Sequence, residues 1–547
     1  MRGLMMDVPL NISAILKHAA RFDGRGEIVS RTVEGPIHRY TYRDAEARSA
    51  RLAHALRALG VVEGVRVATI AWNGYRHFEC YYGIGGIGAV CHTINPRLHP
   101  TQIAYIINHA DDRYVFIDVT FVPLLEALAP HLPRVRGYVI MTDEAHMPAT
   151  SLPNALCYET LLAEQPDSID WPVLEENTAC GLCYTSGTTG DPKGVLYSNR
   201  SQVLHAMSVC IAGATRRSDA SGTMMPIVPM FHVNAWGYPF AAPLMGAKLV
   251  YGGPLHDPAS LYEMIESEGV TQAAGVPVIW LGLLAYVEAN GLSFSTLRCM
   301  GVGGSAAPPS MIAAYEKRGI EVIHGWGMTE TSPVCTNGSI KPKHRSDNLQ
   351  QQLVHQMKAG HVVFGVDMKV LDEEGNVLPD DGHSQGELYV RGPWVISEYY
   401  NNAEATANQF TDDGWFRTGD VISLDDEGYL TIHDRAKDLI KSGGEWISSI
   451  DLENAAVAHP EIAEAAAIAI PHEKWAERPF LVVVRTPESA LGRDDVLAFL
   501  EGKIAKWWMP DDVAFVDELP HTATGKVSKR TLRAQFAEGG IPASTKG

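Results

Sequence analysis

Hydrophobic and polar positions alternate in blocks along the first two-thirds of the chain. Short apolar, β-rich runs are flanked by segments in which apolar residues recur at helical spacing. The clearest runs are residues 65–71, 114–119, 138–141, 248–251 and 297–302, and the clearest helical segment is 278–289. Apolar strands separated by helices are typical of parallel sheets, so this part of the chain predicts an α/β fold.

One helix is marked at both of its ends. Thr41 and Asp44 form a predicted capping box ahead of a segment with leucines on one face, and Gly60 is the predicted stop.

The pattern changes after about residue 360. The β-like runs 366–371, 387–391 and 429–432 are joined by turns rich in Asp, Glu and Gly, which predicts a small antiparallel barrel. A compact pattern follows Lys437, with helices expected at 450–458 and 493–506 and strands at 465–470, 480–485 and 513–516. We therefore expect a large N-terminal unit, residues 1–434, and a small α+β C-terminal unit, residues 435–547.

Composition narrows the class of protein. The 547 residues are 46% hydrophobic and 20% charged, which excludes a wholly disordered chain. The net charge of −19 argues against a nucleic-acid binder, which normally carries a basic surface. The cysteines are sparse, the N-terminal segment matches a signal peptide poorly, and no apolar run approaches the length of a spanning helix. We expect a cytoplasmic protein without stable membrane insertion.

Two short motifs are better explained by packing than by chemistry. Gly83, Gly85 and Gly88 satisfy G-x-G-x-x-G, but aromatic and apolar residues precede them where a dinucleotide loop requires a strand-to-helix turn. We expect them within or late in a helix. Cys180 and Cys183 form a C-x-x-C with no second pair at zinc-site spacing, so buried thiols on a strand are expected.

The segment 184–194, YTSGTTGDPKG, is better explained by ligand binding than by packing. It follows a strand-like run and offers hydroxyl groups, glycines and Lys193, which together suit a polyphosphate ligand. Its spacing is not that of the Walker loop. A Ser/Thr/Gly surface turn would explain the hydroxyls but not the whole ordered pattern.

Further blocks follow this segment in a fixed order. They are 229–236 (PMFHVNAW), 303–308 (GGSAAP), 325–331 (GWGMTET), 418–420 (TGD), 434–438 (DRAKD), 441–446 (KSGGEW) and 524–526 (TGK). Together with 184–194 they resemble the signature blocks of the adenylate-forming enzymes, which include acyl-CoA synthetases, nonribosomal adenylation domains and luciferases. The resemblance covers nearly the whole chain.

The resemblance implies a two-step reaction, in which a carboxylate attacks the α-phosphate of ATP and a thiol then displaces AMP. The implied nucleotide contacts are Thr185, Ser186, Thr188, Lys193, Gly304, Ser305, Ala306, His324, Gly325, Trp326, Gly327, Thr329, Asp420, Arg435, Lys437, Lys441 and Lys526. In the same family, Thr185 and Glu330 would hold Mg²⁺, and Asp420 would accept hydrogen bonds from the ribose. Trp326 would stack on adenine, where the family more often has Tyr.

The remaining implied roles concern catalysis, the acid and CoA. The catalytic set is Lys526, His232, Glu330 and Thr185; the acyl site is His232, Val233, Trp236, Gly303 and Gly327; the CoA loop is Ser442, Gly443, Gly444, Glu445 and Trp446. Lys526 would bridge the substrate carboxylate and the α-phosphate. His232 would orient the carboxylate or gate the pocket, or it is simply a packed histidine. Lys437 would be the hinge about which the C-terminal unit moves.

The function implied is an ATP- and Mg²⁺-dependent acid–CoA ligase acting on small molecules. The sequences of segments 230–236 (MFHVNAW) and 442–448 (SGGEWIS) are most like those of medium- and long-chain fatty-acyl-CoA synthetases and, among them, the bacterial ligases for 3-(methylthio)propionate. A medium- or long-chain fatty-acyl-CoA synthetase is the alternative, and a carrier-loading adenylation enzyme is a more distant one. We also expect a homodimer.

Overall fold

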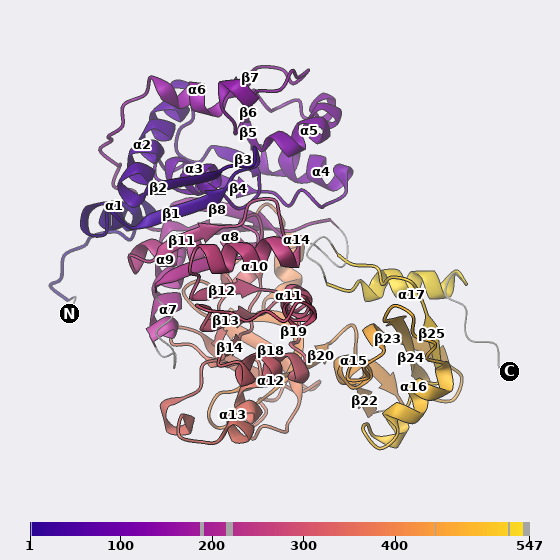
Figure 1. The fold of residues 1–547 in the computed structure, drawn as a ribbon. Helices are drawn as coiled ribbons and strands as arrows, with labels where there is room; N and C mark the ends of the chain where they lie inside the picture. The colour runs from indigo at the N-terminus through magenta and orange to yellow at the C-terminus, as the bar shows by residue number, and fades with distance from the viewer. Residues whose placement is uncertain (2, 186–190, 215–221, 444, 523–525, 540–547) are drawn as a thin grey trace.

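Two seven-stranded sheets organise most of the chain in the computed structural model, which describes residues 1, 3–185, 191–214, 222–443, 445–522 and 526–539 (Figure 1). The first sheet has the order β7-β6-β5-β3-β4-β8-β9, and only β9 is antiparallel to its neighbour. Its strands are β3 (Arg66–Ile70), β4 (Val90–Thr93), β5 (Tyr114–Ile117), β6 (Gly137–Ile140), β7 (Ala155–Cys157), β8 (Ala179–Tyr184) and β9 (Gly194–Ser198).

The second sheet has the order β14-β13-β12-β10-β11-β1-β2, and only β2 is antiparallel to its neighbour. Its strands are β1 (Glu27–Arg31), β2 (Ile37–Thr41), β10 (Thr223–Pro226), β11 (Lys248–Tyr251), β12 (Gln272–Gly275), β13 (Cys299–Val302) and β14 (Glu321–His324). The predicted α/β fold with parallel sheets is therefore confirmed.

Helices separate the two sheets and cover their outer faces. The layer between them contains α1 (Ile12–Phe22), α2 (Tyr42–Ala58), α3 (Tyr75–Gly85), α7 (Asn199–Ala214) and α9 (Tyr238–Leu244). One buried cluster joins α1–α3 to strands of both sheets. The outer face of the first sheet packs against α4 (Pro100–Ala110) and α5 (Val122–Leu128), and that of the second against α10 (Pro258–Ser267), α11 (Pro277–Ala289) and α12 (Pro309–Lys317). Short helices α6 (Tyr158–Ala163), α8 (Val233–Trp236), α13 (Leu349–Gln356) and α14 (Ala403–Gln409) lie in the connections.

Local sequence signals are confirmed in this region. Thr41 accepts from the backbone N–H of Asp44 and Asp44 accepts from that of Thr41, so the capping box is formed. Gly83 and Gly85 lie in α3, and a Cβ on Gly83 would come within 2.7 Å of Leu52. The glycines therefore serve close packing. Cys180 and Cys183 are buried on β8, as expected.

The predicted small barrel is not confirmed. Strands β17 (Asp367–Leu371), β18 (Gly386–Arg391), β19 (Phe416–Leu424) and β20 (Leu430–Arg435) form an open antiparallel sheet in that order, beside the short pair β15 (Thr336–Asn337) and β16 (His361–Val362). Four strands are too few to close around a core. Instead, apolar residues of this sheet form one buried cluster with Val195, Tyr197 and Trp326, which places the sheet against β8, β9 and the segment after β14.

The C-terminal part has its own sheet. Its order is β22-β21-β24-β23, with β25 beside β24, and helices lie on both faces. The elements are β21 (Ile440–Ser442), β22 (Glu445–Ile447), α15 (Ser449–Val457), β23 (Ile462–His472), β24 (Ala476–Arg485), α16 (Arg493–Leu500), β25 (Asp512–Phe515) and α17 (Lys529–Ala537). The predicted helix 493–506 was too long, because Glu501 leaves the helical conformation and Gly502 has φ of +77°.

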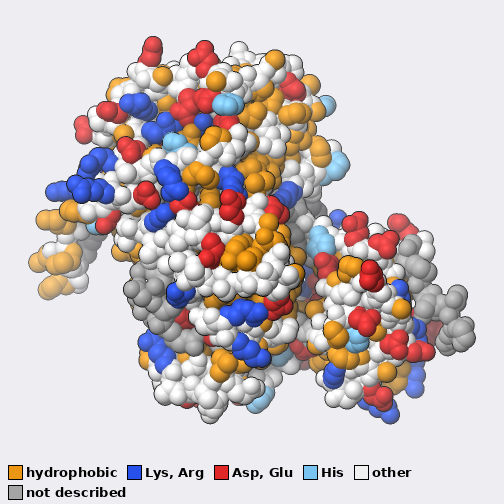
Figure 2. All heavy atoms as spheres, in the orientation of Figure 1, with side chains coloured by type: hydrophobic (Ala, Val, Ile, Leu, Met, Phe, Trp, Pro, Cys, Tyr) orange, Lys and Arg blue, Asp and Glu red, His pale blue; other side chains and the backbone are white. Residues whose placement is uncertain are grey.

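The exposed surface includes an apolar N-terminal segment. Leu4, Met5 and Met6 are 93%, 87% and 92% exposed, and Figure 2 shows hydrophobic side chains gathered where the chain extends ahead of α1.

Candidate active site

The predicted phosphate loop is closed at its base by the β8–β9 hairpin. Tyr184 pairs with Gly194, the backbone N–H of Thr185 donates to the Lys193 carbonyl at 2.9 Å, and that of Lys193 donates to Thr185 Oγ1 at 3.4 Å. His109 Nδ1 lies 2.6 Å from the Tyr184 hydroxyl oxygen, so the entry to the loop is also held by α4. Ser186 and Thr188, predicted to contact phosphate, lie outside the described residues.

Glu330 lies beside the end of this hairpin and is held by a residue that no sequence motif singled out. The Tyr399 hydroxyl donates to Glu330 Oε1 at 2.8 Å, and the ammonium group of Lys193 lies 4.9 Å from the Tyr399 ring centroid. Burial raises the pKa of Glu330, while the Tyr399 hydrogen bond and the positive charges of Arg435 and Lys193 oppose the rise. Thr185 and Glu330 offer oxygen donors only, which fits Mg²⁺ as the ion they would hold.

Asp420 is the centre of a second polar group. Trp326 Nε1 donates to Asp420 Oδ2 at 2.9 Å, and Arg435 Nε lies 2.6 Å from Oδ1. The backbone N–H of Asp420 donates to Thr418 Oγ1 at 3.1 Å. Both carboxylate oxygens are therefore fixed in direction by donors from outside β19.

The predicted adenine-binding segments follow neighbouring parallel strands. Gly304, Ser305 and Ala306 come after β13, and the run from Gly325 to Thr329 comes after β14, directly behind the buried His324. Because parallel strands end at one sheet edge, the two segments lie side by side at the position where α/β folds bind ligands. Only glycine fits at position 327, because a Cβ there would overlap the Pro333 carbonyl oxygen.

The predicted acyl segment has an unusual backbone. Val233, Asn234, Ala235 and Trp236 all have positive φ, between +46° and +53°, so α8 is a single left-handed turn. A Cβ on Gly303 would lie 3.3 Å from the Trp236 ring, which shows that the indole covers this glycine. His232 precedes the turn, and burial followed by the charge of Lys526 lowers its pKa to about 4.

Lys526 brings the C-terminal part into this site. Its backbone N–H donates to Thr522 Oγ1 at 3.2 Å, which holds Lys526 next to Thr522. Burial, and then the charge of Arg435, lower its pKa to about 8, while Asp420 and Glu330 act in the opposite direction. The predicted catalytic and nucleotide residues from five separate blocks therefore meet in one electrostatic group.

Lys437 lies at the edge of this group, and Lys441 lies outside it. Lys437 is exposed in the turn between β20 and β21, but its positive charge still contributes to lowering the pKa of Lys526. Burial lowers the pKa of Lys437 itself, and the charge of Arg435 adds to that fall while Asp438 and Asp420 oppose it. Lys441 Nζ lies 3.0 Å from Glu373 Oε1 and 5.6 Å from the Trp446 ring centroid, and both charged groups of the Lys441–Glu373 pair are exposed. Among the described residues, the contacts of Lys441 thus leave it outside the Asp420–Lys526 group.

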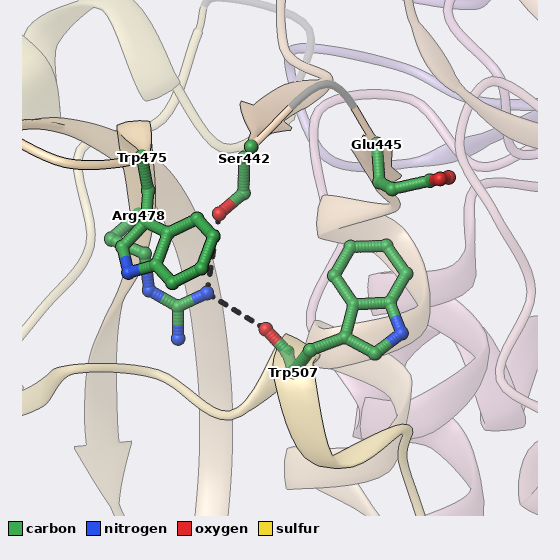
Figure 3. A pocket seen from close by; sticks show the side chains of 6 residues that line it. Ser442, Glu445, Trp475, Arg478 and Trp507 are labelled. Atoms are coloured by element: carbon green, nitrogen blue, oxygen red, sulfur yellow. Dashed lines mark hydrogen bonds between the residues drawn. The ribbon is translucent and has the colours of Figure 1, made fainter.

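The predicted CoA loop borders a cavity of about 440 Å³ (Figure 3). Its lining comes from the C-terminal part: Ser442, Gly443, Glu445, Trp475, Arg478 and Trp507. Arg478 donates to Ser442 Oγ at 3.2 Å and to the Trp507 carbonyl at 2.7 Å, which fixes the guanidinium between the two edges of the cavity. Gly444 lies outside the described residues. Trp475, Arg478 and Trp507 were not predicted, because they lie outside the recognised blocks.

The comparisons with known proteins agree with this arrangement. Residues 16–400 match the AMP-binding enzyme family, and residues 451–526 match the AMP-binding enzyme C-terminal domain. The chain belongs to the AMP-binding enzymes, and the prediction of an AMP-forming acid–CoA ligase that uses ATP and CoA is confirmed.

Particular relatives refine the picture. The chain is 48% identical to a 3-methylmercaptopropionyl-CoA ligase of Ruegeria lacuscaerulensis, over 98% of this chain and 99% of the relative. It is 46% identical to a medium-chain-fatty-acid–CoA ligase of Ectopseudomonas oleovorans, over 98% of each. Its fold is similar to that of the anthranilate CoA ligase AuaEII in complex with anthranoyl-AMP, with a TM-score of 0.85, 24% identity and coverage of 97% and 99%. No helix in the described part of the chain is long and apolar enough to span a bilayer.

Proposed function

We propose that this chain joins 3-(methylthio)propionate, or short- and medium-chain fatty acids, to CoA. The observation that carries the proposal is the position of Lys526, which interacts electrostatically with Asp420, Glu330 and His232. Of these three residues Asp420 is the nearest in sequence, and it lies 106 positions before Lys526 (526 − 420). A lysine in that position neutralises charge that grows as a carboxylate attacks phosphorus. The near-equal identity to two relatives with different acids supports the breadth of the substrate class.

In the proposed first step, the acid and the α-phosphate of ATP are brought together beside Lys526. Lys193 and Arg435 supply further positive charge, and Asp420 holds the ribose. His232 is neutral near pH 7 because its pKa is about 4, so it orients the carboxylate as a hydrogen-bonding group and not as a charge. Mg²⁺ held by Thr185 and Glu330 would offset the phosphate charge. Such chemistry depends mainly on positioning and charge compensation.

The proposed acyl site is bounded by Trp236, which lies over Gly303. Because a Cβ at Gly303 would sit only 3.3 Å from the indole and 3.1 Å from the Gly325 carbonyl oxygen, the wall leaves little spare volume here. A compact thioether acid suits such a wall better than a long chain, unless Trp236 moves.

For the second step, we propose that CoA uses the cavity beside Gly443. The chain would act as two units, 1–434 and 435–547, with Lys437 as the hinge that brings this cavity to the acyl-adenylate. The exposed position of Lys437 between β20 and β21 supports this division. Two aromatic rings and a fixed guanidinium in one cavity suit a nucleotide that carries phosphates.

We also propose a cytoplasmic homodimer. The exposed apolar side chains of Leu4, Met5 and Met6 support an interface that includes the N-terminal segment. Sedimentation velocity on the full chain should give a dimer, and replacing these three residues by serine should shift it toward monomer. A monomer at all concentrations would refute the dimer.

The substrate proposal is tested by release of AMP and pyrophosphate across a series of acids. The series runs from propionate through 3-(methylthio)propionate, hexanoate and octanoate to palmitate, with and without CoA. We expect the highest kcat/KM with 3-(methylthio)propionate or acids of similar length. A clear optimum at palmitate would favour the long-chain alternative, and CoA-independent AMP release would reject the ligase.

A further inference from the structure

The Asp420 carboxylate is held by two donors that reach it from different segments. Trp326 Nε1 donates to Oδ2 at 2.9 Å from the loop after β14, and Arg435 Nε lies 2.6 Å from Oδ1 at the end of β20. We propose that Trp326 is a positioning residue, whose indole N–H sets the Asp420 carboxylate to accept both hydroxyls of a ribose. The proposal rests on the nucleotide role assigned to Asp420 above.

The backbone of Trp326 is fixed before its ring meets Asp420. Its N–H donates to Thr336 Oγ1 at 2.7 Å, and its carbonyl accepts from the backbone N–H groups of Cys335 and Thr336 at 3.2 Å each. Trp326 as a whole residue is 8% exposed and belongs to the buried cluster that includes Cys183 and Tyr197. A ring held in this way presents its N–H in one direction only.

The direction matters because of how a carboxylate accepts hydrogen bonds. Its two oxygens together offer about four lone-pair sites. Trp326 uses one site on Oδ2 and Arg435 uses one on Oδ1, so each oxygen keeps a site for a further donor. Two adjacent hydroxyls, such as the 2′ and 3′ hydroxyls of the ribose assigned to Asp420 above, can donate to these two sites. Without the indole N–H, Arg435 alone orients the group, and the carboxylate can turn about its Cβ–Cγ bond.

This role is distinct from stacking on adenine, which a phenyl ring would also perform. The indole N–H should therefore affect the binding of the ribose hydroxyls, whereas the aromatic face affects the binding of the base. Loss of the N–H should weaken binding of a nucleotide with both hydroxyls more than binding of one that lacks a hydroxyl.

The test compares ATP with 2′-deoxy-ATP, by isothermal titration and by kcat/KM for pyrophosphate release. Trp326→Phe keeps an aromatic face and removes the N–H. We expect about a tenfold loss of affinity for ATP, the scale of a hydrogen bond to a charged group, and a change of less than about twofold for 2′-deoxy-ATP. The loss should appear in KM for ATP more than in kcat.

Trp394→Phe is the matched control. Trp394 lies in the same buried cluster, and its Nε1 donates to the Val334 carbonyl at 2.9 Å. This variant makes the same chemical change at similar cost to the core, and the preference for ATP over 2′-deoxy-ATP should stay at the wild-type value. Benzothienylalanine at position 326 is a second variant, since sulfur replaces the N–H at nearly unchanged shape and folding is preserved.

An equal loss for both nucleotides in the Trp326 variants, or no loss for either, would overturn the positioning role. The titration needs no acid substrate. An enzyme that binds ATP selectively through Trp326 yet activates none of the acids would reject the proposed substrates and leave this inference supported.

Discussion

The lowered pKa of Lys526 makes the first half-reaction sensitive to pH in a predictable direction. Burial is the largest cause, and the charge of Arg435 adds to it, so the pKa falls from the ordinary 10.5 to about 8. A difference of about 2.5 units corresponds to roughly 3 kcal/mol between the charged and neutral forms. Before substrate binds, Lys526 is therefore charged below about pH 8 and neutral above it.

The charged form is the one that compensates phosphate and carboxylate. We expect kcat/KM for ATP to fall as pH rises through about 8, and to approach a tenfold loss per pH unit above it. Bound triphosphate favours the ammonium form, so the corresponding fall in kcat should lie at higher pH, because kcat reports the enzyme–substrate complex. The fall is not unfolding. A lysine whose folded pKa is below its unfolded value makes the protein more stable, not less, as pH rises from 8 to 10.5.

The assay is pyrophosphate release between pH 6.5 and 9.5, with CoA present for kcat and kcat/KM, and in the first turnover without CoA for the rate of acyl-adenylate formation alone. Lys526→Arg keeps a charge at every pH, so its rate should be lower throughout but its alkaline limb should disappear. Lys441→Arg is the matched control, because Lys441 pairs with Glu373 outside the group around Lys526, and it should keep the wild-type limb. A wild-type profile that stays flat to pH 9.5, or an unchanged limb in Lys526→Arg, would refute the reasoning.

Other predictions follow from contacts described above. Tyr399→Phe removes the hydroxyl that holds Glu330, so the Mg²⁺ concentration for half-maximal pyrophosphate release should rise about five- to tenfold. Gly443→Ala places a Cβ 2.7 Å from the Trp475 ring at φ of +64°, so acyl-CoA formation should slow more than tenfold while pyrophosphate release changes less than about twofold. Thr41→Ala removes an N-terminal cap and should lower the free energy of unfolding by about 1 kcal/mol, measured by denaturant titration, with unchanged kinetics.

Each of these has a result that contradicts it. Tyr400→Phe is the control for Tyr399, because the Tyr400 ring packs edge-on against His109, and it should keep the wild-type Mg²⁺ dependence. Equal Mg²⁺ dependence in both variants would remove the role of the Tyr399 hydroxyl. An equal slowing of both half-reactions in Gly443→Ala would argue against a CoA-specific cavity, and unchanged stability of Thr41→Ala would show that the cap contributes little.

The sequence predicts those parts of the fold that depend on local chemistry. The Thr41 cap and the glycines of α3 require only neighbours along the helix and small residues at a close approach. The barrel was not confirmed, because closure of a sheet depends on what lies against it. Its apolar face is covered by Val195, Tyr197 and Trp326, which are up to 227 positions away from Ile422 on β19 (422 − 195).

The residues of the candidate site also fall into those that local motifs predict and those that depend on contacts between distant segments. Motif order locates Lys193, Glu330 and Lys526, because each chemistry-bearing residue lies in its own recognisable block. Tyr399 could not be found from the motifs, because its role depends on the hydrogen bond from its hydroxyl to Glu330, 69 positions earlier in the chain (399 − 330). Lys441 shows the opposite limit, because its block is recognisable but its side chain pairs with Glu373, in the turn that follows β17.

The left-handed turn at Val233–Trp236 has a mechanical consequence for the acyl site. A left-handed helix costs roughly 1–2 kcal/mol per residue, so four residues store roughly 4–8 kcal/mol that packing around Asn234 and Ala235 must hold. Movement of Trp236 away from Gly303 releases this strain only if the backbone of the turn changes conformation with the ring. If the backbone does relax when a long acid displaces the indole, the released strain offsets part of the free-energy cost of that displacement. A short acid leaves the indole and the strained backbone in place.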